Sequence, residues 1–79
     1  MTTHFEYITS NSKILGGKPI LKGSRISVEL VLEWIANGSS VGEIVKEFPQ
    51  ISAEAVKEAI LYAAAVTKST SFFEIELAA

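Results

Sequence analysis

One segment of this sequence has a composition that could bind phosphate. Gly16-Gly17-Lys18 is similar to part of a nucleotide-binding loop, but the Walker pattern has a longer spacing and a Ser or Thr directly after the Lys, where this chain has Pro19. Glycines also allow backbone angles that other residues avoid, and proline fixes φ. We therefore interpret the segment as a sharp structural turn.

Paired carboxylates are a second grouping that could do chemistry. The sequence contains no cysteine and no aspartate and only one histidine, His4, so no catalytic triad or metal site can be completed around them. We expect no enzymatic activity, no cofactor and no metal, and we assign the glutamates to solvated helix faces. The pairs, each four residues apart, are Glu29 and Glu33, Glu43 and Glu47, and Glu54 and Glu58.

Cations gather in the first third of the chain. Residues 1–28 have a net charge of +3 and residues 29–79 one of −5, which together give the chain's −2. Two interpretations stay open with equal weight: solvated turn residues, or a patch that contacts phosphates. If DNA is bound, Lys18, Lys22 and Arg25 are the best candidates, acting like a wing on the backbone or in a minor groove.

The elements that position these residues begin with β structure. His4 to Thr9 has a β-prone composition that predicts a short strand. Ile20-Leu21 and Arg25-Ile26 flank a three-residue turn, which predicts a small hairpin with Gly23 at a positive φ.

Two short capped helices are predicted next. The first covers residues 28–37, between the N-cap Ser27 and the stop at Gly38. The second begins at Ser40, which forms a capping box with Glu43, and ends before the proline at position 49.

A third helix is predicted to begin after Ser52 and to run toward Lys68. The turn before it, residues 49–52, is so short that the second and third helices must cross steeply, as in a helix-turn-helix. Residues 1–68 are thus predicted to form one mainly α domain, a three-helix helix-turn-helix bundle preceded by a short β-hairpin. The expected core stripe of the third helix is Val56, Ala59, Ile60, Ala63 and Val66.

As a DNA reader the third helix is predicted to be weak. Reading helices present their N-terminal side chains to base edges, and here that end offers Ser52 and Lys57 beside the acidic Glu54.

Several apolar residues are candidates for a dimer or partner interface. The first helix has a polar stripe too narrow for an ordinary surface helix, and its Trp34 is as readily an interface anchor as a core residue. Residues 69–79 form a tail whose alternating pattern is typical of a strand that pairs with another chain segment or with a partner. The interface candidates are Leu30, Trp34, Leu61, Tyr62, Phe72, Phe73, Ile75 and Leu77.

The string from Ile14 to Ala64 resembles the domain of unknown function family 433, small bacterial and archaeal proteins whose members look antitoxin-like. Its most specific parts are GGKPILKGSRI, the helix break at Gly38 and the FPQIS turn. The resemblance implies a homeodomain-like fold with a preceding hairpin, and a role beside a nuclease-like toxin of the PIN type. Typical members have Thr where this chain has Ser24, and the tail from Lys68 onward lies outside the shared block.

Two functions follow as hypotheses. The first is an antitoxin-like protein that forms a homodimer, contacts its own operator DNA and masks a PIN-like toxin. The second is a protein-interaction module without nucleic-acid binding, which the net charge of −2 and the isoelectric point near 5.3 favour. The sequence has neither a long apolar run nor a signal peptide, so we expect no membrane association and a cytoplasmic location.

Overall fold

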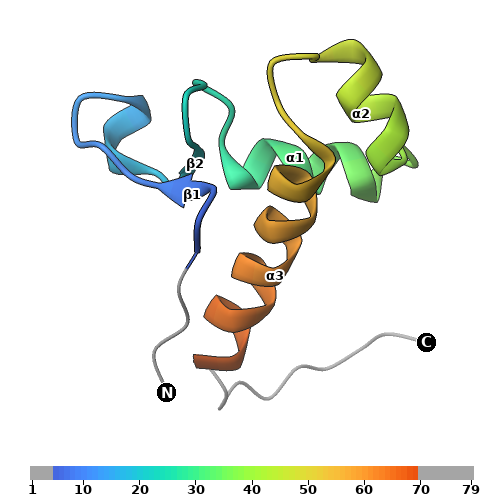
Figure 1. Ribbon diagram of the computed structural model, residues 1–79. Helices are drawn as coiled ribbons and strands as arrows, with labels where there is room; N and C mark the ends of the chain where they lie inside the picture. Colours follow the sequence, from blue (N-terminus) through green and yellow to red (C-terminus); the bar gives the residue numbers. More distant parts are fainter. Residues whose placement is uncertain (1–4, 70–79) are drawn as a thin grey trace.

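The computed structural model describes residues 5–69, which form a pair of short strands followed by three helices (Figure 1). Strand β1 covers Ile8–Thr9 and strand β2 covers Ile20–Leu21, with the 3-10 turn η1 at Leu15–Gly17 between them. This arrangement confirms the predicted fold class, a mainly α helix-turn-helix bundle with a short hairpin in front. The helices are α1 (Val28–Ala36), α2 (Val41–Glu47) and α3 (Ala53–Ser69).

Strand β2 is held on both of its edges. It pairs antiparallel with β1, with Ile8 opposite Leu21. On the other side the Leu21 N–H donates to the Ile26 carbonyl at 2.9 Å, and Gly23 in the turn has the predicted positive φ of 78°. The predicted tight turn is therefore present, but the ladder partner of β2 is β1 rather than Arg25-Ile26. The predicted N-terminal strand is also shorter, because only Ile8–Thr9 forms a ladder.

Helix α1 begins at the predicted residue and ends at Ala36, one residue earlier than predicted, with Asn37 as its C-cap. The Ser27 hydroxyl accepts a hydrogen bond from the Leu30 N–H at 3.0 Å and so satisfies one of the free donors of the first turn. At the other end Gly38 has a φ of 101°, which reverses the chain, and the Ser39 N–H then donates to the Trp34 carbonyl at 3.0 Å. This 6→1 bond is the mark of a Schellman motif.

The capping box of α2 is also present as predicted. The Glu43 N–H donates to the Ser40 hydroxyl at 3.1 Å, and the Ser40 N–H donates to a Glu43 carboxylate oxygen at 2.8 Å. The hydrogen bond from the Ser40 backbone holds the pKa of Glu43 below its ordinary value of 4.5, because it stabilises the charged form. A helix of 7 residues is too short to form alone, so this cap and the packing of Ile44 are what fix α2.

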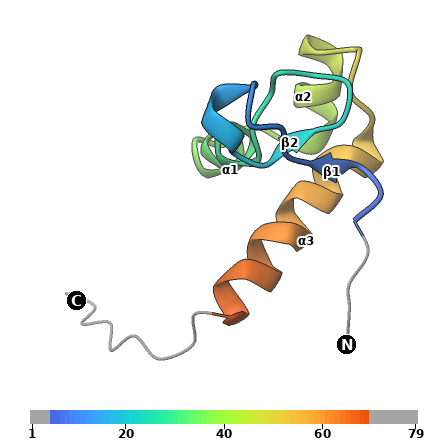
Figure 2. The same cartoon turned by 90° about the vertical axis from the view of Figure 1, so that its left-hand side faces the viewer.

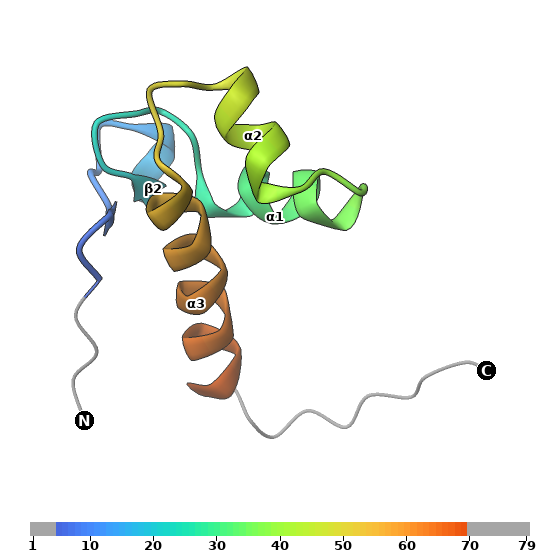
Figure 3. The same ribbon diagram turned by 45° about the vertical axis from the view of Figure 1, so that its right-hand side comes forward.

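Helix α3 is the central element of the bundle. Its cap is Ser52, whose hydroxyl accepts a hydrogen bond from the Ala55 N–H at 3.1 Å. Helix α1 crosses the first half of α3, and α2 lies beside α1 on the far side from the strands (Figure 3). Both strands and the other two helices contribute to the core that forms against this half. The core residues are Ile8, Leu21, Ile26, Val28, Val31, Ile44, Ile51, Ala55, Val56 and Ala59.

The buried face of α3 differs from the predicted stripe. Val56 and Ala59 are buried as expected, and Ala55 joins them. Ile60 and Val66, however, are 37% and 47% exposed, so their assignment to the core was wrong. The physical reason is that the segment before β1 covers the opposite flank of the helix, which turns the buried face away from Ile60.

Tyr62, one of the predicted interface candidates, lies on that covered flank, where it is half-buried and packs against the core. Its ring packs edge-on against Phe5, with the ring centroids 5.2 Å apart. One turn earlier, a carboxylate oxygen of Glu58 accepts a hydrogen bond from the Tyr7 N–H at 3.1 Å. These two contacts fasten residues 5–7 to α3.

The second half of α3 extends beyond the bundle. In Figures 1 and 2 it points away from α1 and α2. The helix therefore presents several of its faces to the surroundings over its last turns.

Candidate interaction surfaces

The turn between β2 and α1 carries two exposed cations. Lys22 and Arg25 stand on either side of Gly23, and both side chains are exposed. The Ser24 hydroxyl holds the turn closed, because it donates to the Leu21 carbonyl at 2.8 Å and accepts from the Ile26 N–H at 3.0 Å. The resemblance gives Thr as the typical residue at position 24, and Ser and Thr both carry the hydroxyl that these two bonds use. We call Lys22 and Arg25 the basic turn.

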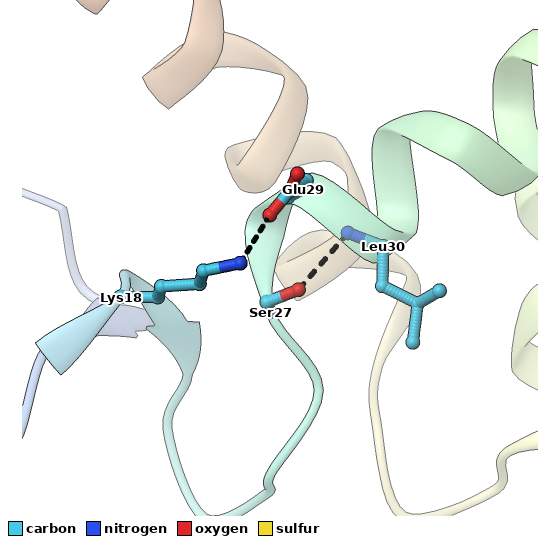
Figure 4. Close-up of polar contacts among 4 residues, drawn as sticks. All are labelled: Lys18, Ser27, Glu29 and Leu30. Carbon is cyan, nitrogen blue, oxygen red and sulfur yellow. Dashed lines mark hydrogen bonds and ion pairs between the residues drawn. The ribbon is translucent and has the colours of Figure 1, made fainter. Parts of the chain in front are cut away.

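Lys18, the third predicted DNA contact, is already engaged. Its ammonium group forms an ion pair with Glu29 at 2.8 Å, across the start of α1 (Figure 4). The hydrogen bond and charge of Glu29 raise the pKa of Lys18, and Lys18 in turn lowers the pKa of Glu29. Both side chains are more than half exposed, so the pair adds little stability.

The N-terminal end of α3 offers little to a DNA base. The Ser52 hydroxyl is occupied by its capping bond to the Ala55 N–H. Lys57 is exposed, but it borders a hollow that Glu54 and Glu58 also line. The predicted DNA-contact residues thus fall in two places, with Ser52 and Lys57 on α3 and the others on the strand side of the molecule.

Trp34 stacks on another aromatic ring of its own chain. The centroids of the Trp34 and Phe48 rings are 4.7 Å apart, and the ring planes differ by 12°. Both rings are half-buried against the core. The stack forms one wall of a groove that Glu43 and Glu47 border. Trp34 was interpreted either as a core residue or as an interface anchor, and its stack on Phe48 supports the core role.

A largely apolar groove lies between α1 and the projecting half of α3. We call it the α1–α3 groove, and the Lys18–Glu29 ion pair stands at its rim. This groove was not predicted from the sequence. Its lining comes from Pro19 and from two different helices, and no periodic pattern in the sequence connects these segments. Its apolar lining consists of Pro19, Val28, Leu32, Tyr62, Ala63 and Val66.

The remaining interface candidates lie apart from one another. Leu61 is 64% exposed on the outer side of α3, whereas Leu30 is 36% exposed on α1 beside Arg25. The candidates in the tail, which are Phe72, Phe73, Ile75 and Leu77, lie outside the described residues.

Within residues 5–69, no three side chains of the types His, Cys, Asp or Glu come together in a way that could hold a metal ion. None of the described helices combines the length and the apolar character needed to cross a membrane.

The hairpin and the three capped helices are the part of the chain that a known family shares. The family model described as a protein of unknown function (DUF433) matches residues 8–63, from β1 to the middle of α3. The chain belongs to the DUF433 family. The matched part of this DUF433 chain contains the basic turn and ends before the last turns of α3.

Two similar proteins show how far the sequence and the fold agree with those of other proteins. The uncharacterized protein y4eO of Sinorhizobium fredii is 38% identical to this DUF433 chain over 60 residues, which are 76% of the chain and 27% of y4eO. The crystal structure of a DUF433 member from Anabaena variabilis superposes with a TM-score of 0.73 at 21% identity, covering 80% of this chain and 62% of that one. The second likeness concerns the fold. The matched stretch of this chain spans about a quarter of the length of y4eO.

Proposed function

We propose that this DUF433 chain is an antitoxin-like helix-turn-helix protein that acts as a homodimer and binds a nuclease-like partner of the PIN type. The observation that carries the proposal is the second half of α3. Residues 61–66 contain no charged side chain, yet this part of the helix extends beyond the bundle (Figure 1). A helix that is apolar on all sides is normally buried, so we infer that other proteins cover this part of α3. No catalytic role is part of the proposal.

The α1–α3 groove is the surface that we assign to the nuclease-like partner. Its floor is apolar and its rim carries the Lys18–Glu29 ion pair, which matches the anatomy of protein interfaces, an apolar centre inside a polar border. The ion pair is exposed, so it can exchange partners with charges on another protein at small cost.

Purification of the tagged full chain from its native host is expected to retain a PIN-type nuclease, and the ribonuclease activity of that nuclease should fall when the chain is added. Ala63→Glu places a charge in the α1–α3 groove without breaking the helix, so this variant should lose the nuclease. Ala36→Glu makes the same change at an exposed position at the end of α1 and should retain it. Mass spectrometry and a ribonuclease assay measure the result, and wild-type protein that retains no nuclease would contradict the proposal.

Operator binding is the second candidate function, and the basic turn favours it. Lys22 and Arg25 are exposed and neither forms an ion pair with another residue between 5 and 69, unlike Lys18. A dimer would present two such turns, which doubles an otherwise small contact with the DNA backbone.

Lys22→Ala and Arg25→Ala are each expected to weaken binding to the DNA upstream of the protein's own gene. Each lost phosphate contact should lower the slope of log affinity against log salt by about one. Lys46→Ala removes an equal charge from the exposed side of α2 and should leave the slope unchanged. Fluorescence anisotropy at several salt concentrations provides the measurement. Absence of wild-type binding at low salt would favour the module without nucleic-acid binding. Equal losses in all three variants would contradict the assignment of the DNA contact to the basic turn.

A further inference from the structure

The outer face of α3 has a charge pattern that the groove does not explain. Glu54, Leu61 and Lys68 are spaced by seven residues, so they fall on one line along a helix of 3.6 residues per turn. All three side chains are exposed, and Leu61 is the most exposed large apolar residue of the described chain, at 64%. We call these three residues the α3 seam.

We propose that the α3 seam pairs with the α3 seam of a second copy, antiparallel, with the two-fold axis at Leu61. Glu54 of each protomer then lies opposite Lys68 of the other, and the two Leu61 side chains meet at the centre. The inference rests on the homodimer of the proposed function and adds its interface and direction.

Charge decides the direction of the pairing. In the antiparallel arrangement both end contacts join opposite charges, because Glu54 and Lys68 are equally far from Leu61. In a parallel arrangement Glu54 would face Glu54 and Lys68 would face Lys68, which repels at both ends. Flanking charges select helix orientation in this way in coiled coils. A two-fold axis also makes the interface self-complementary, so the pair closes and does not grow into a filament.

The surroundings of Leu61 let a second helix approach. Ala64, one turn further along, is exposed and small, and small residues allow helix backbones to come close. Beside Leu61 lies a hollow whose surface is mostly apolar. Its apolar lining is Phe5, Tyr7, Leu61 and Ala65, and Glu54, Lys57 and Glu58 border it. The hollow gives the partner's Leu61 an apolar pocket, and a large side chain that enters such a pocket is typical of interface centres.

Single cysteines test this register directly, because the sequence has no cysteine of its own. In the full-length protein, Leu61→Cys is expected to form a covalent dimer with a short bismaleimide. Glu54→Cys and Lys68→Cys should each stay uncrosslinked alone and crosslink when mixed. Lys46→Cys, on the exposed side of α2, is the control that should not crosslink. Self-crosslinking of Glu54→Cys or Lys68→Cys would show parallel helices and overturn the inference.

Charge exchange gives a second readout that does not depend on thiols. Glu54→Lys or Lys68→Glu alone should weaken the dimer about tenfold, because each change places like charges at both ends. The double exchange, and an equal mixture of the two single variants, should restore the wild-type dissociation constant, as measured by sedimentation equilibrium. Equal affinity of all variants would overturn the seam.

The outcomes separate this inference from the proposed function. A dimer by light scattering that neither crosslinks at position 61 nor responds to charge exchange overturns the α3 seam and leaves the homodimer intact. A monomer at micromolar concentration overturns both. Nuclease retention and DNA binding are measured independently of either result.

Discussion

Replacement of Leu21 by Ala is expected to lower the free energy of unfolding by about 2–5 kcal/mol, the range for large-to-small changes in a packed core. Leu21 has no exposed surface and lies where β2 meets the helices. A domain of 79 residues has a total stability of roughly 4–12 kcal/mol, so this one side chain accounts for a large part of it. The variant should melt well below the wild type, by about 4–8 °C for each kcal/mol lost.

Leu15→Ala is the matched control for this prediction. It removes the same atoms from a residue that is 47% exposed in the turn before β2, so its effect should be within about 0.5 kcal/mol. Urea unfolding followed by far-UV circular dichroism measures both variants. Equal losses for Leu15→Ala and Leu21→Ala would contradict the assignment of the core.

Trp34→Ala is expected to lower the stability by about 2–3 kcal/mol, less than the 3–5 kcal/mol typical of a fully buried Trp because its ring is half-buried. The loss arises from the stack on Phe48, which joins the end of α1 to the end of α2. Trp34→Phe keeps an aromatic ring against Phe48 and should lose about half as much.

Thermal melts at several protein concentrations measure this effect and test the role of Trp34. If the stack stabilises the single chain, the shift in melting temperature will be the same at every concentration. If Trp34 anchored a dimer, the loss would depend on concentration, because subunit association contributes to stability by mass action. That second result would return Trp34 to the interface.

Helix limits were predictable because they are local. Ser27, Gly38 and Ser40 each act on backbone groups within one turn of their own position, so the residue type is enough to identify the role. The chain reversal at Gly23 was predictable for the same reason, since glycine readily adopts a positive φ.

Contacts between distant segments were not predictable. Periodicity showed that α3 has an apolar stripe, but Ile60 and Val66 became exposed because of where residues 5–7 pack and where the bundle ends. The ion pair of Lys18 was not predictable either, because Glu29 lies on another element. Lys22 and Arg25 form no ion pair within the described part of the chain.

The hydrogen bond from Tyr7 to Glu58 joins residues 51 positions apart, and Ile8 shares its core with Val56 and Ala59. A ribosome releases the chain from its N-terminus, so β1 can pair with β2 early but lacks its core contacts until the first half of α3 has left the exit tunnel. The core is therefore completed only after this half of α3 has been made, at about 5–20 residues per second. A product that ends before α3 would lack this core and would expose its apolar residues to proteases.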